Sequence, residues 1–225
     1  MRLDEEYCLS EYVDLGRLGD NEKVHIVRNQ VNGVIGVRKY VALDLEEIYL
    51  FLKENPNVYI PKIYECIQTD TNLIVIEEYL SGKNLEEMLK EKYFSEKDAA
   101  DIIICLCDAL YPLHHAKMPV ICRDLKAENV ILTNEGEVKL VDFDIARIYQ
   151  PGKSKDTVMM GTQGYAAPEQ FGFGQTDART DIYAMGVLLN YMLVREFPME
   201  KLTEGKFRTI VLKCIKINPC LLYTS

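Results

Sequence analysis

The sequence predicts an α+β fold with two lobes: a small β-rich lobe over residues 1–80 and a larger, mainly helical lobe over residues 81–225. Two observations predict this division. Apolar residues mostly alternate with polar ones in the short runs before residue 80, as in strands, and recur at helical spacing in longer runs after it. The 225 residues are 48% hydrophobic and 27% charged, which supplies enough apolar side chains for a core in each lobe.

The first lobe is expected to contain two strand pairs and one helix. Residues 24–27 and 34–41 flank Asn32-Gly33, a dipeptide that tolerates positive φ and so favours a tight hairpin. Residues 45–52 carry apolar side chains at i, i+3, i+4 and i+7, which predicts an amphipathic helix. A second strand pair is expected over residues 63–67 and 73–80.

The second lobe is expected to begin with a long helix. Ser95 and Asp98 have the spacing of a capping box, in which each residue satisfies a backbone amide of the other. The expected buried stripe of this helix is Ile103, Leu106, Leu110 and Leu113. A short hairpin over residues 130–133 and 137–141 follows, and a strongly apolar helix begins near Asp181.

Composition excludes several classes of function. The 26 basic and 35 acidic residues give a net charge of −9, so no broad basic surface is expected to bind nucleic acid. The visible chain holds no run of 18 apolar residues that would span a membrane. The seven cysteines form no CxxC pair and have no histidines at zinc-ligand spacing, so reduced thiols and a cytoplasmic location are expected. The sequence leaves the oligomeric state open.

Four segments carry the chemistry. They are residues 122–129 (CRDLKAEN), 141–144 (VDFD), 161–169 (GTQGYAAPE) and 181–186 (DIYAMG). In this order and spacing, the chain resembles the eukaryotic-type protein kinases, mostly the serine/threonine-specific ones, from about residue 15 to about residue 219. The sequence resembles bacterial members of this family more closely than animal ones. The resemblance implies the two-lobed protein-kinase-like fold.

The resemblance assigns four residues to phosphoryl transfer. Asp124 is the expected catalytic base, and Lys126 the cation beside the transferred phosphate. Asn129 and Asp142 would supply hard oxygen ligands to Mg²⁺, with Mn²⁺ as an alternative ion. The implied nucleotide is ATP.

Lys39 ends the Val37-Arg38-Lys39 sequence and, by resemblance, holds the α- and β-phosphates of ATP. The family pairs this lysine with a glutamate on the next helix, and Glu46 is the first choice here, with Glu47 as the fallback. Alignment also places Glu77 at a position beside the adenine that is more often apolar. A buried, unpaired carboxylate is costly, so Glu77 is expected either to share a network with Lys39 or to reach water.

The remaining nucleotide contacts implied by the resemblance lie in the lid and the hinge: Gly19, Val24, Val37, the carbonyl of Glu78, the amide of Leu80, and Ile131. The lid departs from the family pattern, because Glu22 stands where a glycine usually lets backbone amides approach phosphate. Modest ATP affinity is therefore expected.

The activation segment also follows the family pattern. Thr162 is expected beside Asp124, and Ser154 and Thr157 are the candidates for phosphorylation opposite Arg123. Asp181 is expected to bind the catalytic loop from beneath. The arginine that usually pairs with the glutamate at position 169 is missing from the end of the chain, so a truncated C-terminus is expected, and a membrane anchor beyond it is left open.

The sequence therefore predicts a protein kinase that transfers the γ-phosphate of Mg-ATP to Ser or Thr hydroxyls of protein substrates. Two alternatives remain. A nucleotide-binding pseudokinase, acting as a scaffold or regulatory module, is suggested by the poor glycine loop, Glu77, Cys122 in place of the usual histidine, and the missing tail. A small-molecule kinase is disfavoured, because residues 161–169 resemble a peptide-positioning loop.

Overall fold

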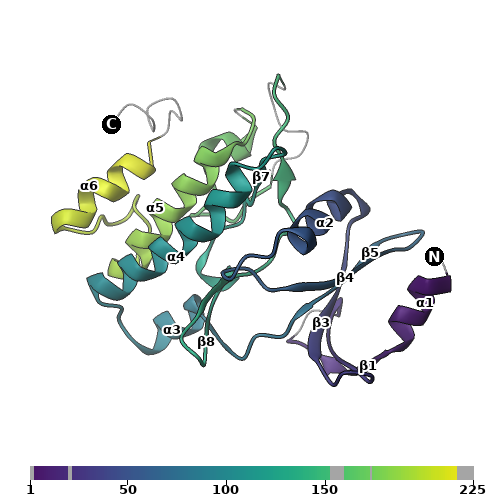
Figure 1. Ribbon diagram of the computed structural model, residues 1–225. Coiled ribbons are helices and arrows are strands. Elements are labelled where there is room, and N and C mark those ends of the chain that lie inside the picture. Colours follow the sequence, from purple (N-terminus) through teal and green to yellow (C-terminus); the bar gives the residue numbers. More distant parts are fainter. Residues whose placement is uncertain (1–2, 20–21, 153–159, 173, 217–225) are drawn as a thin grey trace. The chain divides into compact units, whose positions relative to one another are not determined.

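The computed structural model describes residues 3–19, 22–152, 160–172 and 174–216 (Figure 1). The chain divides into two compact units, an N-terminal unit, Met1–Ser81, and a C-terminal unit, Gly82–Ser225. Within the described ranges, no helix has both the length and the apolar character needed to cross a bilayer.

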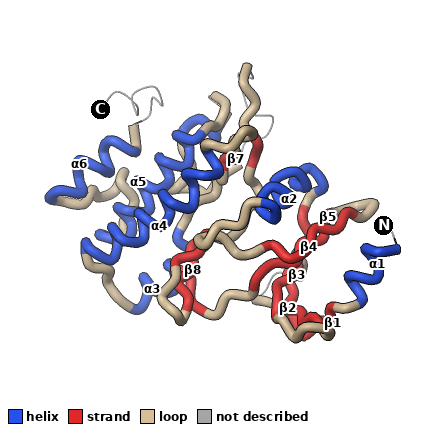
Figure 2. The backbone as a smooth tube through the Cα atoms, in the orientation of Figure 1, coloured by secondary structure: helices blue, strands red, loops and turns tan. Residues whose placement is uncertain are grey.

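The N-terminal unit is built on an antiparallel sheet of five strands, drawn in red in Figure 2. The spatial order of the strands is β1-β2-β3-β5-β4. The elements in chain order are α1 (Leu3–Ser10), β1 (Tyr12–Arg17), β2 (Val24–Asn29), β3 (Ile35–Val41), the 3₁₀ turn η1 (Leu43–Leu45), α2 (Glu46–Glu54), β4 (Ile63–Gln68) and β5 (Leu73–Glu78).

The hairpin predicted around Asn32-Gly33 is confirmed. Strands β2 and β3 pair in antiparallel register, with Val27 opposite Gly36. Gly33 has a φ of 76°, a conformation that a residue with a Cβ rarely adopts. The predicted helix is also confirmed, since α2 buries Ile48, Tyr49 and Leu52 against the sheet next to β4.

The C-terminal unit is mainly helical. In chain order it contains β6 (Gly82–Asn84), α3 (Leu85–Glu91), α4 (Glu96–His114), β7 (Val120–Ile121), η2 (Ala127–Asn129), β8 (Val130–Thr133), β9 (Val138–Leu140), β10 (Arg147–Ile148), η3 (Pro168–Phe171), α5 (Ala178–Val194) and α6 (Gly205–Cys214). Strand β8 lies between β6 and β9, and β7 pairs with β10. The predicted α+β fold class is confirmed.

Helices α4 and α5 lie side by side in the core of this unit (Figure 1). The capping box predicted for α4 is present: Ser95 Oγ accepts the Asp98 amide at 3.1 Å, and Asp98 Oδ2 accepts the Ser95 amide at 3.1 Å. The predicted buried stripe is wrong at one position. Ile103 is only partly buried, whereas Ile102 is 4% exposed, because α4 turns the face that contains Ala99 and Ile102 towards the core.

Candidate active site

Asp124 lies at the centre of a set of hydrogen bonds in the segment between β7 and β8. Thr162 Oγ1 donates to Asp124 Oδ1 at 2.7 Å, and Lys126 Nζ lies 2.8 Å from Asp124 Oδ2. Lys126 Nζ also donates to Thr162 Oγ1 at 3.1 Å. Both oxygens of the carboxylate are therefore oriented by side chains, one of which comes from the activation segment. The predicted contact between Thr162 and Asp124 is confirmed.

Asn129 connects Asp124 to the hairpin that carries Asp142. Its Nδ2 donates to Asp124 Oδ2 at 3.0 Å and to the Asp124 carbonyl at 2.9 Å. The backbone carbonyl of Asn129 accepts a hydrogen bond from the amide of Val141 at 2.9 Å, and Val141 precedes Asp142 in the chain. Because β8 and β9 pair with Val130 opposite Leu140, the residues that flank the two ends of the hairpin are held together. Asp124, Asn129 and Asp142 thus gather in one place.

The residues present fit a hydrated divalent cation. The Nδ2 of Asn129 is used on Asp124, so its Oδ1 remains as a hard oxygen ligand, and Asp142 Oδ1 accepts the Asp144 amide at 3.0 Å, which leaves Oδ2 for the ion. The described residues hold no cluster of three or more acidic, His or Cys side chains suited to a metal. Mg²⁺ is usually held by one or two carboxylates, with the other positions filled by phosphates and water, so a donor set of this size is the kind it uses.

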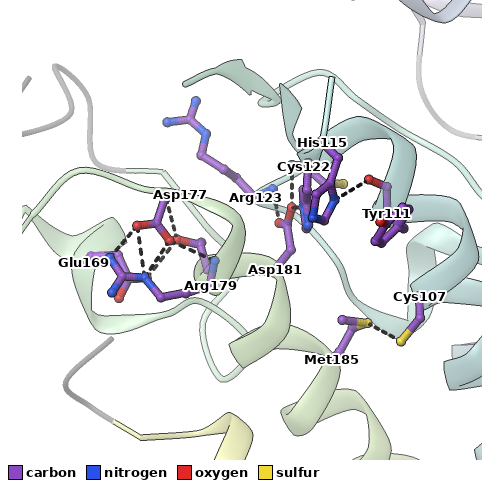
Figure 3. A network of polar contacts seen from close by, with 12 residues as sticks. Cys107, Tyr111, His115, Cys122, Arg123, Glu169, Asp177, Arg179, Asp181 and Met185 are labelled. Atoms are coloured by element: carbon purple, nitrogen blue, oxygen red, sulfur yellow. Dashed lines mark hydrogen bonds and ion pairs between the residues drawn. The ribbon is translucent and has the colours of Figure 1, made fainter. Parts of the chain in front are cut away.

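Asp181, on α5, supports the segment between β7 and β8, which is called the catalytic segment below. This contact was predicted. This fully buried carboxylate accepts the backbone amides of Cys122 at 2.9 Å and Arg123 at 2.8 Å, and lies 2.7 Å from Nε2 of His114 at the end of α4. Figure 3 shows its side chain pointing from α5 towards Cys122 and Arg123. The contact of His114 with Asp181 fits a structural role for this histidine.

Cys122 is fully buried, and its backbone amide donates to Asp181. Burial raises the pKa of the Cys122 thiol well above its usual range, and the negative charges of Asp181, Asp124 and Asp142 raise it further. The Asp124 amide opposes them by hydrogen bonding. A fully buried thiol of this kind packs as a small apolar side chain, which fits its place where the family usually has a histidine.

Arg123 adopts an unusual backbone conformation, with a φ of 65°. Its Nε donates to the carbonyl of Ile145 at 2.7 Å, which ties the catalytic segment to the chain that follows Asp142. Arg123 remains the predicted partner for a phosphate on the activation segment. The two candidate phosphorylation sites, Ser154 and Thr157, lie outside the described residues.

Glu169 is held by Thr180 instead of the arginine of the family pattern. Thr180 Oγ1 donates to Glu169 Oε1 at 2.8 Å, and Glu169 is 7% exposed. Figure 3 shows Arg179 and Asp177 beside Glu169, and Arg179 Nη2 lies 2.5 Å from Asp177 Oδ2. The N-terminus of α5 therefore anchors the end of the activation segment.

In the N-terminal unit, Lys39 pairs with Glu77. The Lys39 Nζ lies 2.5 Å from Glu77 Oε1, and both side chains are largely buried, with 13% and 8% exposure. The expected network between the two is confirmed. Glu46, the first choice of partner, is the first residue of α2 and is partly exposed, so its role with Lys39 stays a prediction.

The other nucleotide-binding candidates are divided between the units, and their role stays a prediction. Gly19 has a φ of 68° and lies just before the undescribed residues 20 and 21. Val24 faces Lys39 across the β2–β3 pair, and Val37 faces Glu77 across the β3–β5 pair. Glu78 ends β5, and its amide donates to the Lys62 carbonyl at 2.8 Å. Leu80 follows in the same unit, and Ile131 lies on β8 of the C-terminal unit.

Sequence reasoning missed one buried polar residue near Asp124, namely Gln170. It follows the Pro168-Glu169 pair of the third motif and is 2% exposed. A single glutamine in a 3₁₀ turn gives no sequence signal, because only the fold shows what its amide contacts.

Comparison with known proteins agrees with the fold. The family model "Protein kinase domain" matches residues 29–221. The chain is 38% identical over 130 residues to the probable serine/threonine-protein kinase PknB of Corynebacterium glutamicum, an alignment that covers 56% of the chain and 20% of that protein. It is 38% identical over 146 residues to the probable serine/threonine-protein kinase CPE1738 of Clostridium perfringens, covering 64% of the chain and 21% of that relative.

A plant relative extends the similarity over more of the chain. The probable serine/threonine-protein kinase PBL8 of Arabidopsis thaliana is 32% identical over 183 residues, which covers 80% of the chain and 44% of that protein. The chain spans less than half the length of each of these three relatives. The chain belongs to the protein kinase domain family, whose members generally use ATP and a divalent metal ion to phosphorylate proteins.

Proposed function

We propose that this protein is a serine/threonine protein kinase that transfers the γ-phosphate of ATP to protein hydroxyls. The observation that carries the proposal is the set of hydrogen bonds that joins Thr162, Asp124 and Asn129, with Lys126 beside the same carboxylate. A purely structural role would explain one such contact, but not the combination of a carboxylate, a lysine and an asparagine amide on one short segment. The family membership and the relatives' names support the same activity.

In the proposed reaction, a substrate Ser or Thr oxygen forms a bond to the γ-phosphorus, the bond from that phosphorus to the β,γ-bridging oxygen breaks, and ADP leaves. Asp124 orients the incoming hydroxyl and accepts its proton. Thr162 and Asn129 keep the Asp124 carboxylate in place, and Lys126 balances negative charge on the transferred group. Asn129 and Asp142 would hold the divalent ion, Mg²⁺ or Mn²⁺, which neutralises phosphate charge when bound.

The N-terminal unit would bind the nucleotide. Lys39 would hold the α- and β-phosphates, with the orientation of its ammonium group controlled by Glu77. Gly19, Val24, Val37, Glu78, Leu80 and Ile131 would contact the remainder of ATP, and Glu46 remains the candidate helix partner of Lys39. A cytoplasmic location is proposed from the described cysteines, which are thiols outside any disulfide.

The test is phosphate incorporation from γ-labelled ATP with Mg²⁺, into the chain itself and into a Ser/Thr peptide library. The parent is compared with Asp142→Asn and Lys39→Met, and with Glu137→Gln, a matched exposed carboxylate on the same hairpin as Asp142. Incorporation by the parent and Glu137→Gln alone supports the proposal. Equal incorporation by Asp142→Asn would overturn it, and thermal stabilisation of the parent by ATP without incorporation would favour a nucleotide-binding scaffold.

A further inference from the structure

Gln170 places a buried amide against the catalytic segment. Its Nε2 donates to the carbonyl of Arg123 at 2.8 Å and to the carbonyl of Met160 at 2.8 Å. Its Oε1 accepts the amide of Ala167 at 3.0 Å. Both N–H groups and the oxygen of one side chain are thus used, at a residue that is 2% exposed. A buried amide with all of these bonds made is held in one orientation.

The two carbonyl groups belong to peptide bonds close to Asp124 and Thr162 in the chain. The Arg123 carbonyl belongs to the peptide bond that leads into Asp124, and Arg123 has a φ of 65°, a conformation that surrounding contacts must maintain in a residue with a Cβ. The Met160 carbonyl belongs to the peptide bond that leads into Gly161, one residue before Thr162. Gln170 therefore ties together the backbone that precedes each member of the Thr162–Asp124 hydrogen bond, which is 2.7 Å long.

The neighbouring glycine fits this arrangement. Gly161 has a φ of 150°, and a Cβ built on it would lie 2.7 Å from Nε2 of Gln170 and 2.7 Å from Cβ of Ala166. A side chain at position 161 would therefore crowd both the amide of Gln170 and Ala166, on a backbone conformation that residues with a Cβ rarely adopt. The close approach of the amide requires glycine at this position.

We propose that Gln170 is a positioning residue for phosphoryl transfer, which sets the geometry between the catalytic carboxylate of Asp124 and the hydroxyl of Thr162. This inference rests on the proposed kinase activity. Gln170 does not touch the reacting atoms in this proposal. It acts through the backbone of Arg123 and of residues 160–162, so its loss would misplace the base without removing any group that binds ATP.

Gln170→Met tests the proposal, because methionine keeps a similar volume and removes the donors and the acceptor. Since small displacements of a catalytic group are costly, kcat is expected to fall by about 10- to 100-fold, with the KM for ATP within about twofold of the parent. Gln175→Met is the matched control. The Gln175 amide donates at 2.9 Å to the Gln150 carbonyl, which is not part of the catalytic segment, and this variant is expected to keep the parent kcat.

Gly161→Ala provides a second route to the same contact. If both variants act by separating the amide from the carbonyls, the double variant with Gln170→Met is expected to lose no more than the worse single variant. Full additivity of the two losses would overturn the shared mechanism. An unchanged kcat in Gln170→Met, with an active parent, would overturn the inference itself.

Amide hydrogen exchange separates this inference from the proposed function. In Gln170→Met the Ala167 amide loses its acceptor, so its exchange is expected to speed up relative to the amides within α5. Unchanged exchange of the Ala167 amide would contradict the hydrogen bonding by Gln170, whatever the kinase activity of the variant. A parent that incorporates no phosphate would overturn the proposed function, and with it the proposed effect of Gln170 on catalysis. The exchange result would still decide whether Gln170 makes its hydrogen bonds.

Discussion

Replacing Asp181 with asparagine is expected to destabilise the C-terminal unit strongly. The buried carboxylate accepts bonds from three donors: the amides of Cys122 and Arg123, and Nε2 of His114. In Asp181→Asn the single amide oxygen can serve the Cys122 amide and His114, which both face Oδ2. The new NH₂ group would then face the Arg123 amide, donor against donor.

The size of the loss follows from these contacts. A hydrogen bond to a charged group contributes about 1.5–3 kcal/mol, and a buried amide left unsatisfied costs about 1–3 kcal/mol. Because the two effects overlap, we expect the free energy of unfolding to fall by about 3–5 kcal/mol, in the range for breaking a buried polar pair. For a chain of this size, the melting temperature should fall by about 10 °C.

The assay is urea unfolding followed by far-UV circular dichroism, with Asp101→Asn as the control. Asp101 is exposed on α4, so its substitution is expected to change the free energy of unfolding by no more than about 0.5 kcal/mol. A loss of less than about 1 kcal/mol in Asp181→Asn would refute the reasoning. It would mean that water or a rearranged catalytic segment satisfies the Arg123 amide.

Three further predictions concern local features. Gly82→Ala should cost about 2 kcal/mol, because a Cβ there would lie 2.3 Å from the Leu132 carbonyl oxygen and force β6 away from β8; unchanged urea unfolding would contradict this. Ser95→Ala should cost about 1 kcal/mol through loss of the α4 cap, a prediction that fails if helicity and stability stay at the parent values. Burial raises the pKa of the Cys66 thiol to about 11, so between about pH 9 and pH 11 the unfolded chain loses this proton first and stability falls. Cys66→Ala should show a shallower fall over that range, and an identical slope would count against the raised pKa.

Local chemistry made several elements predictable from sequence. The Asn32-Gly33 turn and the Ser95–Asp98 capping box are short-range signals, and both appear in the structure. The same rule would have found α3, since Asn84 caps it in a box with Glu87. The short strand β6, which starts at Gly82, was not predicted. Its first residue is a glycine that permits the close approach of β8, a contact that only the fold reveals.

Long-range partners were harder to predict. The contacts of Asp181 and Thr162 with the catalytic segment could be expected from motif order, and the structure confirms both. The pairing of Glu169 with Thr180 could not be expected, because the family pattern gives this glutamate an arginine partner and no motif points to Thr180. The bonds of Gln170 could not be expected either. Neither residue type nor spacing specifies which carbonyls a buried amide will meet.

The most direct test of the central claim is the effect of Mg²⁺ on ATP binding, measured by isothermal titration calorimetry with and without the ion. The claim is that Asn129 and Asp142 hold a divalent ion beside Asp124. In the parent and in the Glu137→Gln control, Mg²⁺ should tighten ATP binding. In Asp142→Asn that gain should fall by about tenfold or more, as expected when a ligand is lost from a metal site, while binding without Mg²⁺ stays near the parent value. The same Mg²⁺ dependence in Asp142→Asn and in the parent would contradict the claim.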